Sequence, residues 1–360
     1  MSQADKTLII LAPGFPNNED DTSWTPFVQL MVKALKRNSP GLNIVVLSFF
    51  YPGLVSQYTW HGIKVISFNG MEKGKWRRIW LWRKIWKELK IIQRSHSVMG
   101  IFSIWCGECA FIGKYFGRRH SIPHYTWICG QDARKTNKWV SFIQPRANQL
   151  VAMSPFLVNE FYKNHRVKPA HIIPNAVDPE TFPPAMSIRK DIDIFGAGGL
   201  VPLKQYDIFT RVVGSLQELM PGIIAFHCGT GAEREKIETL IQQFGLGKNL
   251  ALLGEKKHEE VLRLMQRTKL FLHTANYEGF GGVCIEALYA GAHVISFCYP
   301  LDHPVPHWHV VNNEEEMKAK AIEILQNDNT EYSSVLVYKM DDSARSVMNL
   351  FEKDSAGKTR

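Results

Sequence analysis

The feature that most constrains the fold is a repeated alternation of short apolar runs, glycine-bearing turns and amphipathic stretches. Thr7–Ala12 is a short apolar run that ends at Pro13-Gly14, and a stretch with helical periodicity follows it. Asn43–Phe49 is then a second, β-branched run. A strand, a glycine-bearing loop, a helix and a second strand at this spacing predict a βαβ unit with parallel strands.

The same alternation continues along most of the chain and restarts once, after a proline-rich linker at about 183–190. Two doubly wound α/β domains are therefore expected, at 1–185 and 186–330. Residues 331–360 are expected to form a helical segment. One arrangement open to this segment is to pack back onto the first domain. The predicted strands are Lys64–Phe68, Met99–Ile104, His124–Ile128, Gln149–Met153, Asp191–Gly196, Ile223–His227, Leu250–Leu253, Leu270–Thr274 and His293–Phe297, and the predicted helices are 154–162 (capped by Ser154, with Pro155 at its first position), 204–219, 232–244, 258–267 and 281–290.

The net charge of +9 is unevenly distributed. Residues 1–185 hold 24 Lys and Arg against 11 Asp and Glu, whereas residues 186–360 hold 19 against 23. Nine of the ten tryptophans lie at or before Trp139. A basic, aromatic half indicates an anionic partner, either a membrane surface or a nucleic acid.

Composition excludes several classes of protein. With 45% hydrophobic and 21% charged residues the chain is neither disordered nor fibrous, and six irregularly spaced cysteines do not make a disulfide scaffold. No uncharged apolar run reaches the ~18–20 residues that span a bilayer, and Leu8–Ala12 is too short for a signal-peptide core. We therefore expect a cytoplasmic protein, with peripheral attachment at the inner face of the membrane as a further expectation.

The densest motif runs from Glu278 to Glu286. Glu278 follows an apolar strand and precedes three glycines within four positions. A strand, a glycine-rich turn and a helix start can hold a phosphate on backbone N–H groups. Glu286 lies in an otherwise apolar helix, where a buried carboxylate needs a hydrogen-bonding partner such as a ribose diol. Alternatively, Glu286 lies on a solvated stripe of that helix.

This stretch resembles the acidic motif of retaining GT-B glycosyltransferases of family 4, the glycosyl transferases group 1. Four further segments resemble the same family in the same order, over most of residues 150–295: Ile172–Asp178 followed by Phe182 (with Ala176 where glycine is usual), Gly198 to Lys204, His227–Glu233 and Leu252–Lys256. The resemblance implies two facing Rossmann-like domains with a cleft between them. It also implies transfer of a sugar, with retention of configuration, from a UDP- or GDP-sugar to a glycan or lipid-linked acceptor.

The resemblance also implies roles for single residues. Glu278 would hold hydroxyls of the donor hexose, Glu286 would hold the ribose, and Lys204 would neutralise the leaving diphosphate. The predicted catalytic residues are Glu278, Lys204 and Asp132. The predicted donor-binding residues are Gly14, Gly199, Lys204, Gly229, Gly231, Gly254, Glu255, Lys256, Glu278, Gly279, Phe280, Gly281, Gly282, Val283 and Glu286. No metal and no cofactor are expected, because the nucleotide sugar is a substrate.

Three positions depart from the family pattern. Gly199 stands where an arginine usually accompanies the lysine, and Cys129 stands where many relatives carry a histidine. The first loop, Pro13–Asp21, is acidic and bulkier than the usual glycine pair, which leaves the acceptor open. Asp132 is either an acceptor-side base or a helix cap.

Four weaker signals are interpreted as structural. Asp191–Asp193 matches a metal-binding Asp-x-Asp pattern, and Cys106–Cys109 has the spacing of a redox motif. The other two signals are a histidine cluster, His303 with His307 and His309, and a partial dinucleotide fingerprint, Gly196–Gly199. Each of the four motifs lacks the companion residues that its chemistry requires.

The segment Lys73–Arg94 combines nine Lys and Arg with four Trp, and Glu88 is its only acid. It is either an amphipathic helix that covers the sheet or a helix that lies on anionic lipid headgroups. A nucleic-acid partner is not expected, since no recognised binding fold accompanies the segment. The apolar side of the predicted helix consists of Ile79, Leu81, Trp82, Ile85, Trp86, Leu89 and Ile92, with Trp76 and Trp80 among the basic residues.

Two other functions remain open at this stage. One is a nucleotide-sugar epimerase or hydrolase on the same architecture, which would release a free sugar or an epimer without an acceptor. The other is a non-catalytic protein that binds a membrane or nucleic acid and has a degenerate donor site. The missing arginine and histidine favour this second alternative, whereas Glu278, Glu286 and Lys204 oppose it.

Overall fold

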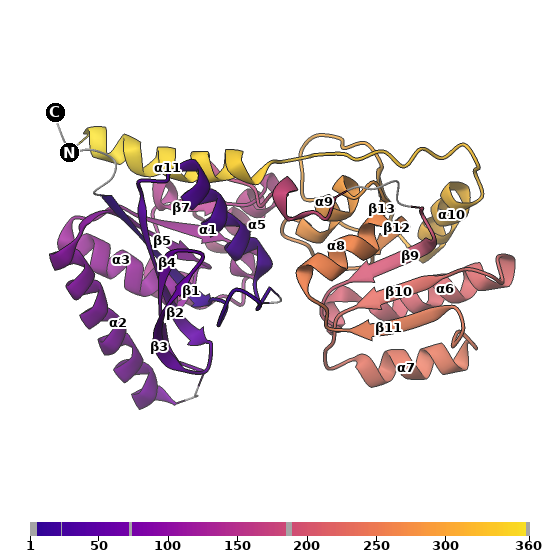
Figure 1. Cartoon of the computed structure of the whole chain (residues 1–360), viewed down its shortest axis with the longest axis horizontal. Coiled ribbons are helices and arrows are strands. Elements are labelled where there is room, and N and C mark those ends of the chain that lie inside the picture. Colours follow the sequence, from indigo (N-terminus) through magenta and orange to yellow (C-terminus); the bar gives the residue numbers. More distant parts are fainter. Residues whose placement is uncertain (1–5, 23, 72–73, 185–188, 358–360) are drawn as a thin grey trace. The chain divides into compact units, whose positions relative to one another are not determined.

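The computed structural model describes residues 6–22, 24–71, 74–184 and 189–357. The chain divides into two compact α/β units (Figure 1). The first unit comprises Met1–Asn175 and Met340–Arg360, and the second comprises Ala176–Lys339. The domain boundary expected after residue 185 from the sequence lies on residues outside the described part of the chain.

The first unit is built on an eight-stranded sheet in the order β3-β4-β2-β1-β5-β6-β7-β8. All neighbouring strands are parallel except β3 and β4, which form an antiparallel pair. The strands are β1 (Lys6–Gly14), β2 (Asn43–Tyr51), β3 (Val55–Trp60), β4 (Ile63–Phe68), β5 (Ser97–Ile104), β6 (His124–Ile128), β7 (Leu150–Ala152) and β8 (His171–Ile172).

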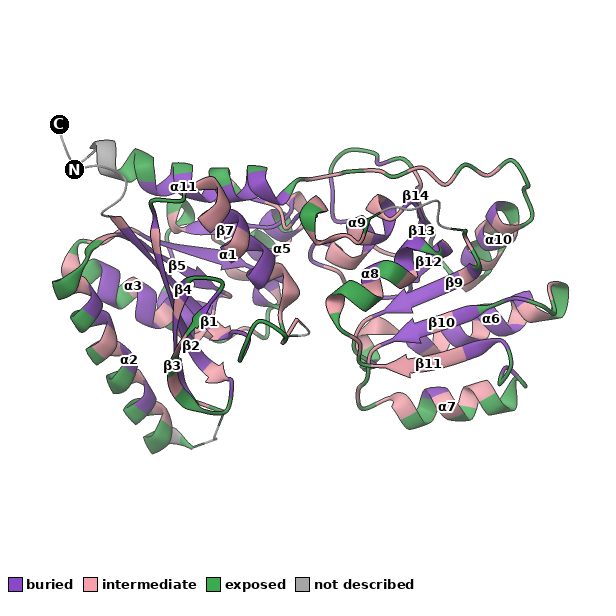
Figure 2. Ribbon diagram, viewed as in Figure 1, coloured by how far each residue is buried: buried purple, intermediate pink, exposed green. Residues whose placement is uncertain are grey.

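Helices cover this sheet because its central strands are apolar on both faces. Leu8–Ala12 of β1 are all buried, as are 44–49 of β2 and 99–104 of β5 beside it (Figure 2). Such continuous apolar runs are typical of parallel strands, which need helices on both sides. The helices are α1 (Pro26–Asn38), α2 (Lys75–Ser95), α3 (Glu108–His120), α4 (Trp139–Ile143), α5 (Pro155–His165) and α11 (Met340–Gly357). The predicted cap of α5 is confirmed, since Ser154 accepts a hydrogen bond from the Leu157 N–H at 3.1 Å.

The C-terminal helix α11 packs on the first unit, next to α1 and β5. Arg37 on α1 donates to Asp341 at 2.5 Å from Nη2 to Oδ1. The ring of Phe351 lies directly over Gly100, where a Cβ atom would come within 2.1 Å of it. Gly100 therefore provides the space in β5 that lets α11 approach the sheet.

The second unit contains a six-stranded parallel sheet in the order β11-β10-β9-β12-β13-β14. The chain starts in the middle, builds outward to β11 and then returns to β12, which is the strand order of dinucleotide-binding folds. Its strands are β9 (Ile192–Ala197), β10 (Ala225–Cys228), β11 (Leu250–Gly254), β12 (Thr268–His273), β13 (His293–Ser296) and β14 (Trp308–Val310). Its helices are α6 (Tyr206–Leu219), α7 (Arg234–Gln243), α8 (His258–Gln266), α9 (Gly282–Tyr289) and α10 (Glu314–Leu325).

Two elements differ from the sequence-based expectation. The helix predicted around Val335 and Val337 is wrong, because residues 326–339 contain a turn and then a stretch without regular structure, and a helix starts only at Met340. Val335 donates its backbone N–H to the Leu288 carbonyl instead, so this strap is held against α9. The antiparallel strand β3 was not predicted. Its signal is the two-residue turn His61-Gly62, whose φ values of +44° and +74° are typical of a tight hairpin.

None of the helices among the described residues is both long and apolar enough to cross a bilayer.

Candidate active site

The predicted site residues of the second unit follow the carboxyl ends of its parallel strands. Lys204 lies in the short 3-10 helix Pro202–Lys204 after β9, and Glu278 lies in the loop after β12. These two strands are neighbours in the sheet, although their connections run in opposite directions from this point. In open α/β sheets, ligands bind in the crevice formed at such a switch point.

Lys204 and Glu278 meet in a compact polar cluster with His273. Lys204 Nζ lies 2.7 Å from Glu278 Oε2, and His273 Nε2 lies 3.2 Å from the same oxygen. The Thr274 hydroxyl donates to the Lys204 carbonyl at 2.7 Å, which attaches the Lys204 loop to the end of β12. Two loops that are far apart in the sequence are thereby held together around one carboxylate.

The cluster shifts the pKa values of Glu278 and His273. Burial raises the pKa of Glu278, but the hydrogen bond from His273 and the charge of Lys204 outweigh it and hold this pKa far below its usual range. Burial lowers the pKa of His273. A neutral His273 therefore donates Nε2–H to Glu278, which carries its negative charge at neutral pH.

One oxygen of Glu278 keeps acceptor capacity for a ligand. Oε2 accepts from both Lys204 and His273, whereas Oε1 has a long contact of 3.4 Å with the Phe280 N–H. The side chain of Glu278 is 20% exposed, and that of Lys204 is 24% exposed. The arrangement therefore offers a fixed carboxylate oxygen for a hydroxyl beside an ammonium group for an anion.

Two glycine-bearing loops lie in backbone contact next to this cluster. A Cβ atom on Gly229 would lie 2.0 Å from the Gly198 carbonyl oxygen, and one on Gly231 would lie 2.3 Å from the Leu200 oxygen. Gly229 also has φ +134°, a conformation that side chains disfavour. The predicted donor-binding Gly229 and Gly231 are thus needed for the contact between the loops after β9 and β10.

The predicted phosphate cradle forms the start of α9. Gly281 is the N-cap residue with φ +78°, and Gly279 and Phe280 before it are buried. The first-turn N–H groups, which include those of Gly282 and Val283, have no acceptor within a helix. Free N–H groups at a helix start are of the type that binds anions, so the phosphate site predicted here stays a prediction.

Glu286 of α9 has a partner that sequence reasoning missed. His258 at the start of α8 places Nε2 2.8 Å from Glu286 Oε1. Both side chains keep limited exposure, 13% for His258 and 18% for Glu286. The hydrogen bond to His258 explains how a carboxylate is tolerated in an apolar helix. Part of the Glu286 side chain stays open to solvent.

The remaining predicted donor-binding residues lie at three places. Gly199 is sterically open, with its nearest Cβ contact at 3.7 Å. Gly254, with φ +72°, accepts the Gly229 N–H, and Glu255 and Lys256 follow it in the loop after β11. Gly14 belongs to the first unit, where the indole of Trp24 occupies the space beside it.

Asp132 is a buried residue of the first unit that caps a turn. Its Oδ2 accepts the Cys129 N–H at 2.9 Å, at the start of the 3-10 helix Gly130–Ala133. Burial raises its pKa to about 7. This hydrogen bond supports the interpretation of Asp132 as a cap.

Three of the four weaker motifs have a structural explanation. Asp191 forms a two-point pair with Arg267, and Asp193 pairs with Lys269. Cys106 and Cys109 are buried, and burial raises the pKa of both thiols well above the usual value. His307 and His309 lie parallel to the ring of His293. Among the described residues there is no group of three or more His, Cys, Asp or Glu that could hold a metal ion.

His227 in β10 gives a testable pH dependence. Its two ring nitrogens have no hydrogen-bond partner among the described residues, and burial lowers its pKa to about 3. Because the folded pKa lies below the unfolded value, the neutral form is favoured by folding, and this stability is lost as pH falls below about 6.5. Between pH 7 and pH 5 the loss amounts to about 2 kcal/mol, at about 1.4 kcal/mol per pH unit below the unfolded pKa.

We expect His227→Phe to remove this part of the pH dependence. Urea denaturation at pH 8, 7, 6 and 5 measures the free energy of unfolding of both proteins. The difference between variant and wild type should be constant from pH 8 to pH 7 and then shift in favour of the variant by about 2 kcal/mol at pH 5. If the free energies of unfolding of wild type and variant differ by the same amount at every pH, the pKa of His227 is not lowered by folding.

His273 and His258 are the site residues that the sequence analysis did not single out. His273 is the last residue of an apolar strand, directly before the loop that carries Glu278. A polar side chain at the carboxyl end of a buried strand is a usable signal, because that edge faces the ligand in such sheets. His258 has no comparable signal, because only the packing of α8 on α9 brings it to Glu286.

The sequence and the fold are both similar to those of known proteins. Residues 179–338 match the family described as glycosyl transferases group 1. A relative from Homo sapiens, which is one of the subunits of phosphatidylinositol N-acetylglucosaminyltransferase, is 31% identical over 215 residues. These residues are 58% of this chain and 44% of the relative. The chain thus spans less than half of that relative's length.

Two solved structures match nearly the whole chain. Anabaena HepE in complex with UDP and glucose has a TM-score of 0.67 at 15% identity, with 98% of this chain and 99% of HepE covered. WaaG, a glycosyltransferase involved in lipopolysaccharide biosynthesis, has a TM-score of 0.64 at 14% identity, with 98% of each chain covered. Two parallel-sheet α/β units with this likeness show the GT-B fold. The similarity to glycosyl transferases group 1 covers residues 179–338, which make up nearly the whole second unit.

Proposed function

We propose that the protein is a glycosyltransferase that moves a sugar from a nucleotide sugar to a glycan or lipid-linked acceptor with retention of configuration. The observation that carries the proposal is the cluster of Lys204, His273 and Glu278 at the switch point of the second sheet. The match of residues 179–338 to glycosyl transferases group 1 and the adjacent glycine loops support the same function.

In the proposed reaction, the side chains of the site and the start of α9 bind the donor through the polar atoms described above. Glu278 Oε1 accepts hydroxyls of the donor hexose, and Glu286 binds the ribose beside His258. Lys204 and the first-turn N–H groups of α9 stabilise the charge that develops on the leaving diphosphate. The reaction as proposed uses no metal and no cofactor.

The donor is proposed to be a UDP-sugar, with UDP-N-acetylglucosamine as the first to test and GDP-sugars next. HepE binds UDP and glucose, and the human relative is named an N-acetylglucosaminyltransferase. The phosphatidylinositol in that relative's name supports the lipid-linked type of acceptor over a free glycan. We further propose a cytoplasmic location, with peripheral attachment at the inner face of the membrane.

A thermal-shift panel of UDP-, GDP- and dTDP-sugars tests the donor. At 100 times the dissociation constant, a donor stabilises the folded state by about 2.7 kcal/mol, a shift of several degrees. Lys204→Met should remove the shift. Stabilisation by none of the nucleotide sugars or nucleoside diphosphates would refute the proposal. A free sugar or epimer formed without any acceptor would instead indicate a hydrolase or an epimerase.

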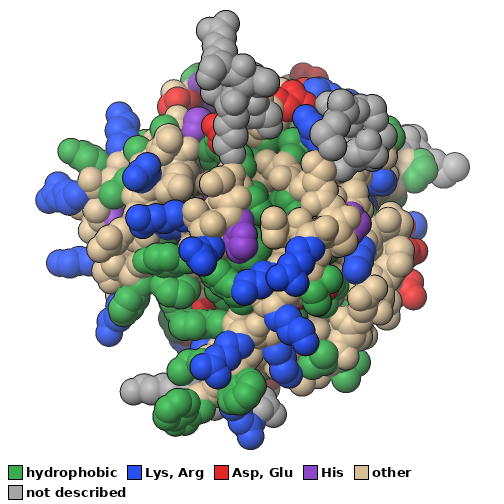
Figure 3. Space-filling model, turned by 90° about the vertical axis from the view of Figure 1, so that its left-hand side faces the viewer, with side chains coloured by type: hydrophobic (Ala, Val, Ile, Leu, Met, Phe, Trp, Pro, Cys, Tyr) green, Lys and Arg blue, Asp and Glu red, His purple; other side chains and the backbone are tan. Residues whose placement is uncertain are grey.

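The membrane contact is proposed to involve α2. Leu81, Ile85 and Leu89 are buried against the sheet, whereas Trp76 and Trp80 are 79% and 61% exposed. Figure 3 shows the face of the molecule that lies on the left in Figure 1. Basic and hydrophobic side chains are frequent on this face, and acidic ones are few. Lys73 lies outside the described residues. Exposed tryptophans among Lys and Arg are favoured at the surface of anionic membranes.

Replacing Trp76 and Trp80 by serine is expected to weaken binding to vesicles of phosphatidylcholine with phosphatidylserine. The partition coefficient should fall about tenfold or more, because two large apolar rings leave the interface. Co-sedimentation measures it. Leu219→Ser, which removes an apolar side chain that is 55% exposed in the second unit, is the matched control. Equal sedimentation of the double variant and wild type would contradict the role of α2.

A further inference from the structure

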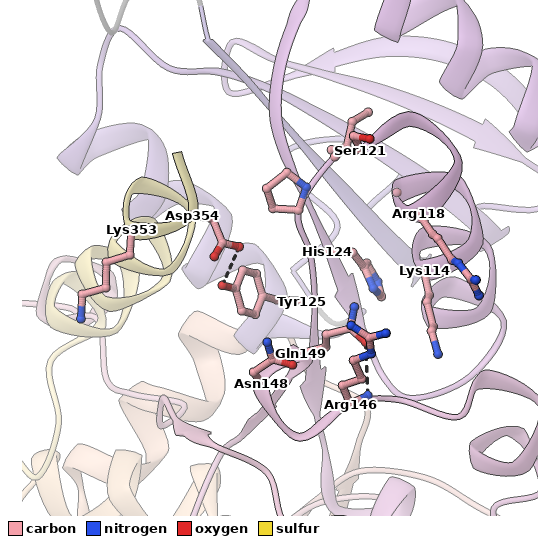
Figure 4. A pocket seen from close by; sticks show the side chains of 13 residues that line it. Lys114, Arg118, Ser121, His124, Tyr125, Arg146, Asn148, Gln149, Lys353 and Asp354 are labelled. Carbon is pink, nitrogen blue, oxygen red and sulfur yellow. Dashed lines mark hydrogen bonds between the residues drawn. The ribbon is translucent and has the colours of Figure 1, made fainter. Parts of the chain in front are cut away.

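The first unit contains a pocket that the proposed reaction does not use. It has a volume of about 600 Å³ and lies between the end of α3, the start of β6, the short 3-10 helix Ala147–Gln149 and α11 (Figure 4). His124 and Tyr125 are the first residues of β6, so the pocket opens at the amino ends of the strands. Substrate sites of such sheets lie at the opposite edge, where the strands end.

The side chains around the pocket are predominantly cationic. Lys114 and Arg118 line it from α3, Arg146 from the segment before β7, and Lys353 from α11. The one acidic lining residue, Asp354, accepts a hydrogen bond from the Tyr125 hydroxyl at 2.9 Å. The pocket therefore carries a clear excess of positive charge.

The positive groups are close enough to repel one another. Lys114 and Arg118 lie four residues apart on α3, where like charges destabilise a helix. Burial, and then the charges of Arg146 and Arg118, lower the pKa of Lys114. Neither guanidinium has a hydrogen bond or an ion pair with a carboxylate among the described residues. A bound anion would relieve this repulsion.

The shape and the donors of the pocket fit a phosphate group. Lys114 donates to the carbonyls of Ile143 and Gln144 at 2.5 Å each, which fixes its ammonium group and leaves one N–H for a ligand. Arg118 and Arg146 supply planar donor pairs that match phosphate oxygens. His124 stays neutral, because burial and the charge of Lys114 lower its pKa to about 3. The cavity is larger than a phosphate ion, so it also accommodates a group esterified to it.

We propose that this pocket binds the phosphate group of a phosphorylated ligand, through Arg118, Arg146 and Lys114. The site is separate from the donor site and does not depend on the proposed glycosyl transfer. The ligand is either a soluble phosphate ester or the headgroup of a phospholipid, which present the same chemistry to these residues.

Calorimetric titration with inorganic phosphate and with glycerol phosphate, at constant ionic strength, tests the proposal. Arg118→Gln/Arg146→Gln is expected to weaken binding at least tenfold. Arg119→Gln, an exposed neighbour on α3 that does not line the pocket, should change it less than twofold. Lys204→Met should leave this binding unchanged, which separates the pocket from the donor site. Equal affinity of wild type and the double variant, or no binding by wild type, would overturn the proposal.

Vesicles distinguish the two sources of phosphate. A Trp76→Ser/Trp80→Ser background removes the proposed contribution of α2, and the probe is phosphatidylcholine with 10% phosphatidic acid. If adding Arg118→Gln/Arg146→Gln lowers sedimentation tenfold, the ligand is a lipid headgroup. If phosphate titration is lost and sedimentation is unchanged, the ligand is a soluble ester. If neither assay responds, the pocket does not bind phosphate.

Discussion

Glu278→Ala is expected to abolish glycosyl transfer while the protein stays folded. Loss of one preorganised electrostatic contact typically lowers kcat by about 10²–10³. Glu278 also orients Lys204 and His273, which both donate to its Oε2. We therefore expect a loss of at least about 10³-fold, since residues that act as a unit fail together. Measurement of sugar transfer from the donor found in the thermal-shift panel gives this rate.

Two comparisons make the result specific. Glu278→Gln keeps an acceptor oxygen for Lys204 and His273 but loses the charge, so it separates geometry from electrostatics. Glu259→Gln changes a carboxylate on α8 whose one ion pair among the described residues is with the exposed Arg263, and it should leave activity within twofold. Unchanged circular dichroism and retained UDP binding would show that the fold is intact. Turnover above a tenth of wild type in Glu278→Ala would refute the role of Glu278.

Gly229→Ala is expected to destabilise the second unit by about 3 kcal/mol or more. The added methyl group would lie 2.0 Å from the Gly198 carbonyl oxygen, so the two loops must separate. The backbone at φ +134° adds strain of about 1–3 kcal/mol, and overpacking costs a further ~1–3 kcal/mol. Urea denaturation measures the loss, and separation of the loops should also weaken donor binding.

Gly199→Ala is the matched control for this change. Gly199 lies in the same loop, but a Cβ atom there meets nothing closer than 3.7 Å. Its stability should stay within about 0.5 kcal/mol of wild type. If it still binds the donor more weakly, Gly199 contacts the donor itself. Equal stability of both variants would show that the close approach at Gly229 is not needed.

The sequence predicted the central strands well because they are buried on both faces and are continuous apolar runs. β6 was predicted with its observed bounds, His124–Ile128. β3 was missed because it is an edge strand with alternating exposure, and such strands carry a weak signal. Residues 331–339 were predicted as part of a helix because Val335 and Val337 are apolar. In the fold they are not helical, and the backbone N–H of Val335 donates to Leu288 of α9.

For the candidate site, the sequence predicted which residues gather at the carboxyl edge, and the structure showed how they act on one another. Lys204 and Glu278 were predicted from their motifs, 74 residues apart. His273 and His258 were not, because their importance depends on reaching one atom of a carboxylate on another loop. Side-chain distances of this kind follow from packing and cannot be read from spacing.

The sequence by itself determined the class of fold, the basic character of the first unit and the glycine-rich loop around Glu278. These properties are local, since they depend on apolar periodicity, on charge and on which residues tolerate tight turns. Only the tertiary structure decided that α11 packs on the first unit and that Gly229 meets Gly198. It also decided that four cations converge on one pocket. Each of these brings together residues that are distant in the chain, and burial, steric exclusion and charge repulsion act only once the fold has done so.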